Sequence, residues 1–137
     1  MAKDKYHEQV KRALEKDGWI ITHDPYILRV EGFRPLPVDL GAEKLIAATK
    51  GKDKIAVEIK TFPGLSQITD FYGALGKFRF YAPMLVHQEP DRVLYLAVPL
   101  VAWKTFFSKE AVQEVVEINN LKIFVYEPHK EEIVLWT

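Results

Sequence analysis

The stretch KIAVEIKTF, which runs from Lys54 to Phe62, decides the fold of this sequence. It is rich in the β-branched residues that favour strands. Side chains alternate between the two faces of a strand, and the two faces differ here: Ile55, Val57 and Ile59 lie on one, and Ala56, Glu58 and Lys60 on the other. The first face predicts contact with an apolar core. The second places a carboxylate beside an amine, which a purely structural strand does not need.

The residues before this strand predict that it is the second half of a β-hairpin. Residues 43–62 read as two β-prone runs, and KGKD at 50–53 supplies a turn between them. A short helix over residues 42–50 is the competing interpretation. The turn signal and the long β-rich run after it favour the hairpin.

The rest of the chain alternates helical and extended patterns. We predict helices over 3–17, 66–83 and 108–120, and strands over 19–24, 34–40, 92–100, 121–127 and 132–137. Residues 25–33 fit either a second extended piece or a long loop. Ser66 and Ser108 are the expected helix caps. This order predicts a single α/β or α+β domain over residues 1–137, with a central mixed sheet flanked by helices.

The helix at 66–83 carries two stripes of side chains at helical spacing. The expected buried stripe contains Ile68, Phe71, Tyr72, Leu75, Phe78 and Ala82. The second stripe contains Gln67, Asp70, Ala74, Lys77 and Tyr81. We interpret the second stripe as a polar face, which is either exposed to solvent or turned toward a site.

Composition excludes several classes of protein. Apolar residues make up 48% and charged residues 28% of the 137 positions, which is a globular mixture. There is no cysteine, so disulfides and zinc–thiolate sites are excluded. No apolar run approaches the length of a membrane span, and the charged start MAKDKYHEQV is unlike a signal peptide. We therefore predict a cytoplasmic protein with no membrane partner.

The net charge is zero, which argues against strong nonspecific binding of nucleic acid. The charge is nevertheless unevenly distributed. Residues 1–80 hold 14 basic and 11 acidic side chains, and residues 81–137 hold 5 and 8. The basic half is the one that contains the charged strand.

Asp39 supplies a second carboxylate for the charged strand. In RPLPVDL, Leu36, Val38 and Leu40 share one parity and Asp39 has the other. An Asp and a Glu on neighbouring strands can hold Mg²⁺ or Mn²⁺, which take oxygen ligands. Lys60 can then contact the attacking water or the phosphate. Asp39, Glu58 and Lys60 together are typical of a metal-dependent phosphodiesterase, with Asp39 and Glu58 as the metal ligands.

The alternative is that Glu58 and Lys60 form an ordinary ion pair on a solvated face. Two features favour the catalytic interpretation: Asp39 precedes them at a suitable separation, and apolar residues flank both carboxylates. A basic turn, formed by Lys50, Lys52 and Lys54, lies nearby in the sequence and can meet phosphate.

Four more side chains are accessory candidates. Glu43 can serve as a third carboxylate or lie at a solvated strand entrance. Gln67 can reach the site or a phosphate from the start of the long helix. Lys77 and Arg79 on the same helix can contact backbone phosphates, and an exposed polar face is the alternative for all three helical residues.

Several segments give the sequence a family resemblance. PVDL followed by EIK resembles the PD-(D/E)xK motif of restriction-endonuclease-like nucleases. The segments KDGWIITHDP, DLGAEKLIAATKGKDKIAVEIKTF, SQITDFYGALGKF and DRVLYLAVP resemble the XisH family of fdxN-element excision controlling factors. The resemblance covers roughly residues 3–137.

The resemblance implies a restriction-endonuclease-like fold, DNA as a partner, and a role in DNA element excision beside companion Xis proteins. It implies metal binding by Asp39 and Glu58 and the motif lysine at Lys60. Two functions remain open at this point. One is a metal-dependent endonuclease, and the other is a regulatory or assembly subunit without catalysis.

The end of the chain predicts association. IFVYE and IVLWT are β-prone, apolar and close to the terminus, and an uncovered edge strand invites pairing. We predict a homodimer, or a complex with a companion excision factor. The expected contact is residues 121–137 or the stretch Trp103–Phe107.

Overall fold

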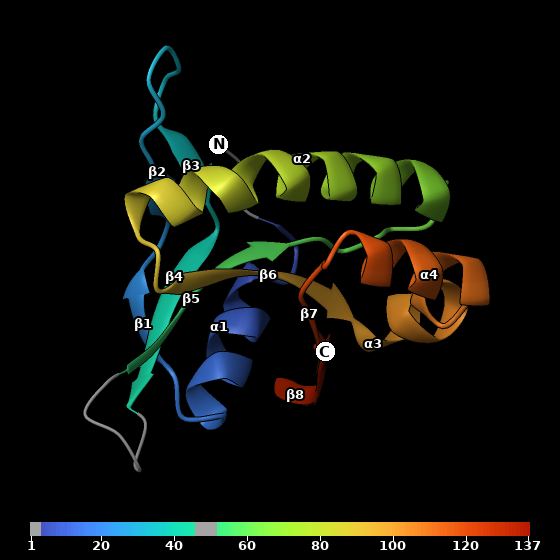
Figure 1. Cartoon of the computed structure of the whole chain (residues 1–137). Coiled ribbons are helices and arrows are strands. Elements are labelled where there is room, and N and C mark those ends of the chain that lie inside the picture. Colours follow the sequence, from blue (N-terminus) through green and yellow to red (C-terminus); the bar gives the residue numbers. More distant parts are fainter. Residues whose placement is uncertain (1–3, 46–51) are drawn as a thin grey trace.

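A computed structural model describes residues 4–45 and 52–137 of the chain (Figure 1). Its centre is a six-stranded mixed sheet in the order β1-β4-β5-β6-β7-β8. The strands are β1 (Ile20–His23), β4 (Leu40–Leu45), β5 (Lys52–Ile59), β6 (Arg92–Pro99), β7 (Ile123–Glu127) and β8 (Glu132–Trp136). The pairs β5–β6 and β6–β7 are parallel, and the other three pairs are antiparallel. The predicted mixed sheet is confirmed.

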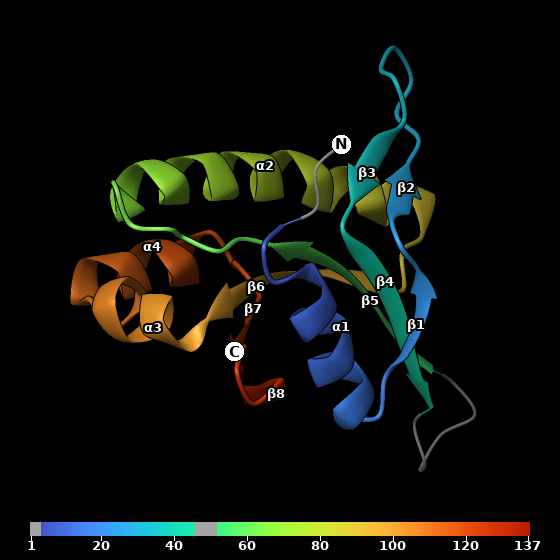
Figure 2. The same ribbon diagram turned by 180° about the vertical axis from the view of Figure 1, so that it is seen from behind.

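Helices cover both faces of the sheet (Figures 1 and 2). One face packs on α1 (His7–Lys16). The other packs on α2 (Gln67–Gln88) and on a connected group of three, α3 (Leu100–Ala102), the π-helical turn η1 (Trp103–Phe107) and α4 (Glu110–Ile118). Because each face has its own apolar core, strand β5 is buried from both sides. The charged face of KIAVEIKTF therefore lies beneath helix α2 and not in open solvent.

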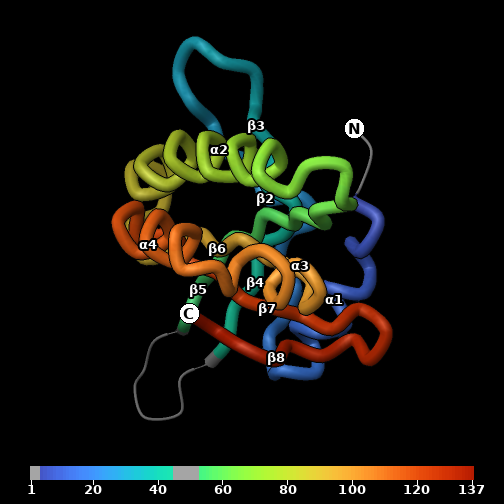
Figure 3. The backbone as a smooth tube through the Cα atoms, turned by 90° about the vertical axis from the view of Figure 1, so that its right-hand side faces the viewer, coloured from blue at the N-terminus to red at the C-terminus, as the bar shows by residue number. Residues whose placement is uncertain are grey.

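A small second sheet stands beside the main one. It pairs β2 (Tyr26–Leu28) with β3 (Leu36–Val38), and we call residues 26–38 the arm. The loop at its tip extends beyond α2 (Figures 1 and 3). The choice that the sequence left open over residues 25–33 is thus settled as a short strand followed by a loop.

The predicted hairpin before KIAVEIKTF is confirmed where the structure describes it. Strands β4 and β5 are antiparallel, with Leu40 opposite Val57 and Leu45 opposite Lys52. The helix considered over 42–50 is wrong for residues 42–45, which are strand. Lys50 and most of the expected turn lie outside the described residues.

The expectation of one continuous strand over RPLPVDL is wrong. Strand β3 ends at Val38, the chain bends at Asp39, and β4 begins at Leu40. Val38 packs into the core under α2, whereas Leu40 packs into the core under α1. The alternation of side chains between two faces holds only within one sheet. Here the chain leaves the arm and enters the main sheet at Asp39.

Helix α2 is longer than predicted, and the side that it turns to the core differs from the predicted one. Ser66 caps it as expected, since its hydroxyl accepts the Thr69 N–H at 3.3 Å. The helix continues through Pro83, which lies on the exposed side where water can satisfy the carbonyl left without a donor. The buried residues are Phe71, Ala74, Phe78, Tyr81 and Leu85, and the predicted core residues Ile68 and Tyr72 are exposed.

The predicted start of the last helix also needs correction. Helix α4 begins after Lys109, and the Ser108 hydroxyl donates to the Lys104 carbonyl at 2.8 Å and does not cap α4. The preceding π-helical turn, which the sequence did not predict, places Phe106 and Phe107 in the core. The closing hairpin of β7 and β8 is confirmed.

Candidate metal centre

Asp39 and Glu58 meet because of the register between β4 and β5. Leu40, the first residue of β4, pairs with Val57, so Asp39 just before β4 lies at the end of β5 that carries Glu58. The Asp39 carboxylate also accepts the Ile59 backbone N–H through Oδ2 at 2.7 Å. This bond fixes Asp39 to the end of β5, next to the glutamate. The negative charge of Asp39 also acts on Glu58, so the two carboxylates are neighbours, and their binding of a metal stays a prediction.

Glu58 is the most strongly perturbed side chain of the pair. Its side chain is 13% exposed, and its Oε1 atom is buried without a hydrogen-bond partner among the described residues. Burial, followed by the negative charge of Asp39, raises the pKa of Glu58 to about 7. The two carboxylates thus share a poorly solvated space, and a positive charge there would stabilise both.

Lys77 supplies that positive charge. Its ammonium group forms an ion pair with Glu58 Oε2 and lies 5.4 Å from the centre of the Tyr81 ring. Burial alone would lower the pKa of Lys77, but the hydrogen bond and charge of Glu58 raise it above its ordinary value. Lys77 and Tyr81 stand one helical turn apart on α2, so the helix presents both to the carboxylates.

Lys60, the motif lysine, does not pair with Glu58 in the described part of the chain. It follows the last residue of β5, and its backbone N–H donates to the Ala97 carbonyl at 3.0 Å. The side chain is half-buried. Within residues 4–45 and 52–137 its ammonium group makes no ion pair, so the counter-ion of Glu58 in this structure is Lys77.

The carboxylate pair fits a hard divalent cation. Both groups offer oxygen ligands, and Glu58 Oε1 is a buried acceptor without a donor. A dication beside Asp39 and Glu58 would remove their mutual repulsion and satisfy that oxygen. The residues present therefore suit Mg²⁺ or Mn²⁺.

Two accessory candidates lie apart from this pair. Glu43 is four residues along β4 from Asp39, where its carboxylate is 3.5 Å from Arg92 Nη2. The Gln67 amide donates to the Thr105 hydroxyl at 2.8 Å, on the side of η1. The structure joins neither residue to Asp39 and Glu58.

The basic candidates are scattered. Lys54 pairs with Glu89 at 3.4 Å and with Asp91 at 3.3 Å, at the opposite end of β5 from Glu58. Arg79 is exposed on the outer side of α2. The Lys52 side chain, like Lys50, lies outside the described part of the chain. Of the predicted phosphate contacts, Lys77 alone touches a predicted metal ligand in the described structure.

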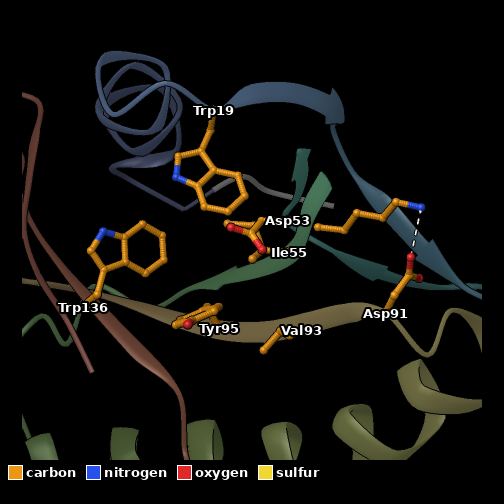
Figure 4. Close-up of a pocket in the computed structure, with 8 residues that line it drawn as sticks. Trp19, Asp53, Ile55, Asp91, Val93, Tyr95 and Trp136 are labelled. Atoms are coloured by element: carbon orange, nitrogen blue, oxygen red, sulfur yellow. Dashed lines mark ion pairs between the residues drawn. The ribbon is translucent and has the colours of Figure 1, made fainter. Parts of the chain in front are cut away.

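Two further features lie elsewhere in the molecule. His7, Glu8 and Asp24 bring one potential ligand atom each within 4.8 Å of one another, but the Lys11 ammonium already contacts Asp24 at 2.8 Å. A pocket of about 320 Å³ lies between the rings of Trp19, Tyr95 and Trp136 (Figure 4). It opens on the α1 side of the sheet, so it is separate from the carboxylate pair.

Sequence analysis placed Ala74, Lys77 and Tyr81 on one stripe of the helix, but it did not predict that Lys77 pairs with Glu58. The signal that could have marked this stripe as inward is the apolar Phe78 beside it. These residues share the inward side of α2 once Ile68 and Tyr72 are assigned to the outer side. No helix in the described part of the chain has the length and apolar character needed to cross a bilayer.

Comparison with known proteins gives consistent results. The family model for the XisH protein matches residues 1–134. A crystal structure of an XisH family protein from Nostoc punctiforme is 41% identical, with a TM-score of 0.84 over 97% of this chain and 98% of that one. A crystal structure of a fdxN element excision controlling factor protein from Anabaena variabilis is 43% identical, with a TM-score of 0.85 over 98% of each chain. No curated protein matches. With a match over nearly its whole length, the chain belongs to the XisH family.

Proposed function

We propose that this protein controls the excision of a DNA element, and that it cleaves phosphodiester bonds at a PD-(D/E)xK site. The controlling role comes from the name of the Anabaena variabilis relative. The nuclease assignment rests on one observation: Asp39, held by the Ile59 N–H, neighbours Glu58, whose buried Oε1 has no donor among the described residues. A restriction-endonuclease-like fold is part of this proposal.

Each residue has a defined part in the proposed reaction. Asp39 and Glu58 would hold Mg²⁺ or Mn²⁺, which would supply charge to stabilise the phosphate oxygens and would acidify water. The Ile59 N–H orients the Asp39 carboxylate and keeps it on the side of Glu58. Lys60, half-buried and without an ion pair among the described residues, is free to approach the attacking water or the phosphate.

Thermal unfolding in Mg²⁺ or Mn²⁺, run beside a plasmid-nicking assay, tests the proposal. Wild type should gain stability with the cation, because a ligand that binds only the folded state stabilises it by mass action. Asp39→Ala and Glu58→Ala should lose both the shift and the nicking. Lys60→Ala should keep the shift and lose nicking by roughly 10²–10⁴-fold, the usual contribution of a positioned acid or base.

The assay should be repeated with the companion excision factor present. If wild type shows neither a cation shift nor nicking under either condition, the nuclease proposal is wrong. A regulatory or assembly subunit would then be the function of this chain. Equal nicking by all four proteins would identify a contaminating nuclease.

A further inference from the structure

The Lys77 ammonium group lies beside the place where the proposed cation should bind. It contacts Glu58 Oε2, and the negative charge of Asp39 also acts on it. The cation would bind the donorless Oε1 of the same carboxylate, next to Asp39, so the two positive charges would lie only a few ångströms apart. Like charges at that separation repel each other in a poorly solvated site, so a bound cation favours withdrawal of Lys77.

The side chain of Lys77 has room to withdraw. It is 43% exposed, and its flexible four-carbon stem can turn toward solvent. Gly73, one turn earlier on α2, leaves the adjoining surface open, since a Cβ added there would meet no atom within 4 Å. A phosphate group that approaches the carboxylates along this flank of α2 would come within reach of the released ammonium group.

We propose that Lys77 is the resident counter-ion of the metal-free site, and that it moves from Glu58 to a DNA phosphate when a divalent cation binds. This inference rests on the proposed function. It adds a coupling between the two ligands. Without the cation, Lys77 stays on Glu58 and cannot contact DNA; with the cation, Lys77 can contact a DNA phosphate. By linkage, DNA then strengthens cation binding to the same extent that the cation strengthens DNA binding.

The first test is the Mg²⁺ affinity of Lys77→Met, measured calorimetrically at pH 9, where protons compete least for Glu58. Without the competing ammonium group, Lys77→Met should bind Mg²⁺ about fivefold more tightly, as expected for loss of a partly exposed ion pair. Lys77→Arg should stay near wild type. Arg79→Met is the matched control, because it removes one positive charge from the exposed side of the same helix.

The second test is the binding of a labelled 20-base-pair duplex by fluorescence anisotropy, in EDTA and in Ca²⁺, over a range of salt concentrations. Lys77→Met should weaken binding in Ca²⁺ and reduce the slope of log K against log salt by about one, which corresponds to one lost phosphate contact. In EDTA its slope should equal that of wild type. Arg79→Met should change DNA binding by the same amount in EDTA and in Ca²⁺.

The outcomes separate the two proposals. If wild type and Lys77→Met bind Mg²⁺ equally, the proposed movement of Lys77 from Glu58 to DNA is wrong and the metal site stands. The same holds if Lys77→Met weakens DNA binding equally in EDTA and Ca²⁺. If neither protein binds any divalent cation, the metal site itself is wrong, and the proposed movement fails with it. Circular dichroism of Lys77→Met must match wild type, and the charge-preserving Lys77→Arg repeats the comparison if it does not.

Discussion

Glu58 obtains its properties from three different elements. Strand β5 holds it, the bend before β4 brings Asp39 against it, and α2 buries it and supplies Lys77. A carboxyl in such a place resists ionisation, because burial and a like charge both disfavour the anion. A cation beside the pair would relieve both costs.

Glu58 should make the metal-free protein less stable as the pH rises. Its pKa is about 7 in the folded protein and about 4.5 in the unfolded chain, so between these values the unfolded chain binds fewer protons. Stability then falls with rising pH across this window, by at most roughly 3 kcal/mol. Glu58→Gln has no carboxyl group to titrate at this position. Its melting temperature relative to wild type should therefore rise between pH 4.5 and 7 in thermal melts with EDTA. Parallel melting curves would contradict this.

Glu89 should have the opposite effect. Its carboxylate accepts hydrogen bonds from Arg92 Nε and from the Tyr26 hydroxyl, both at 2.7 Å, and the Arg92 bond above all lowers the pKa of Glu89 to about 2. The stability that Glu89 adds is complete above pH 4.5 and is lost as the pH falls toward 2.

Glu89→Gln should cost roughly 3 kcal/mol at pH 7, because it leaves the buried Arg92 guanidinium without its main partner. Urea denaturation at pH 7 and pH 3 should show the cost shrinking at the lower pH. Asp91→Asn, which changes an exposed carboxylate nearby, is the control and should cost less than about 1 kcal/mol. If Glu89→Gln lowers the free energy of unfolding equally at both pH values, the charge of Glu89 does not contribute to stability.

The site residues differ in how far sequence could predict them. Asp39 and Glu58 were predictable because strand spacing and charge in an apolar run carry the signal. The partner of Glu58 was not, since Lys60 is nearer in sequence while Lys77 reaches it through the packing of α2. The contact depends on the rotation of a helix, which local sequence does not determine.

At the level of elements, α2 shows why its buried face was misassigned. Apolar residues occur around much of its circumference, so periodicity alone indicates more than one possible core stripe. The packed stripe includes Ala74 and Tyr81, while Ile68 and Tyr72 remain exposed. The bend at Asp39 is similar: the sequence pattern fits one strand, and only pairing with two different partners divides it.

The glycines of α2 give a prediction for this helix. A Cβ added at Gly73 or at Gly76 would meet no atom within 4 Å. Gly76→Ala should therefore raise the free energy of unfolding by roughly 0.5–1 kcal/mol, because alanine loses less conformational entropy in a helix. Chemical denaturation measures this. Gly64→Ala, at φ +105°, is the contrasting variant and should destabilise. Destabilisation by Gly76→Ala would mean that the helix is not the one described.

At the level of the whole molecule, the sheet has two edges, β1 and β8. Strand β8 exposes Val134 and Leu135, whereas Phe106 and Phe107 are buried and cannot meet a partner directly. We propose that the association, a homodimer or a complex with the companion factor, uses the β8 part of residues 121–137.

Val134→Lys should weaken this association by charging the β8 edge. Sedimentation velocity at micromolar concentration, with and without the companion factor, would measure the change. Ile20→Lys is the matched control at the β1 edge, where Ile20 is 69% exposed. A monomeric wild type that does not change on mixing would rule out the association. Equal weakening by both variants would move the contact away from β8.

The engagement of Lys54 with Glu89 and Asp91 has a consequence for how the protein would meet DNA. A lysine that is already neutralised by the protein displaces no condensed ions from a duplex, so it adds nothing to the entropy that drives nonspecific binding. Without Lys54, four of the five predicted phosphate contacts remain, so log K should fall with log salt with a slope no steeper than roughly −4. Such a protein would search bare chromosomal DNA poorly. Its delivery to the right sequence would then depend on whatever it binds first.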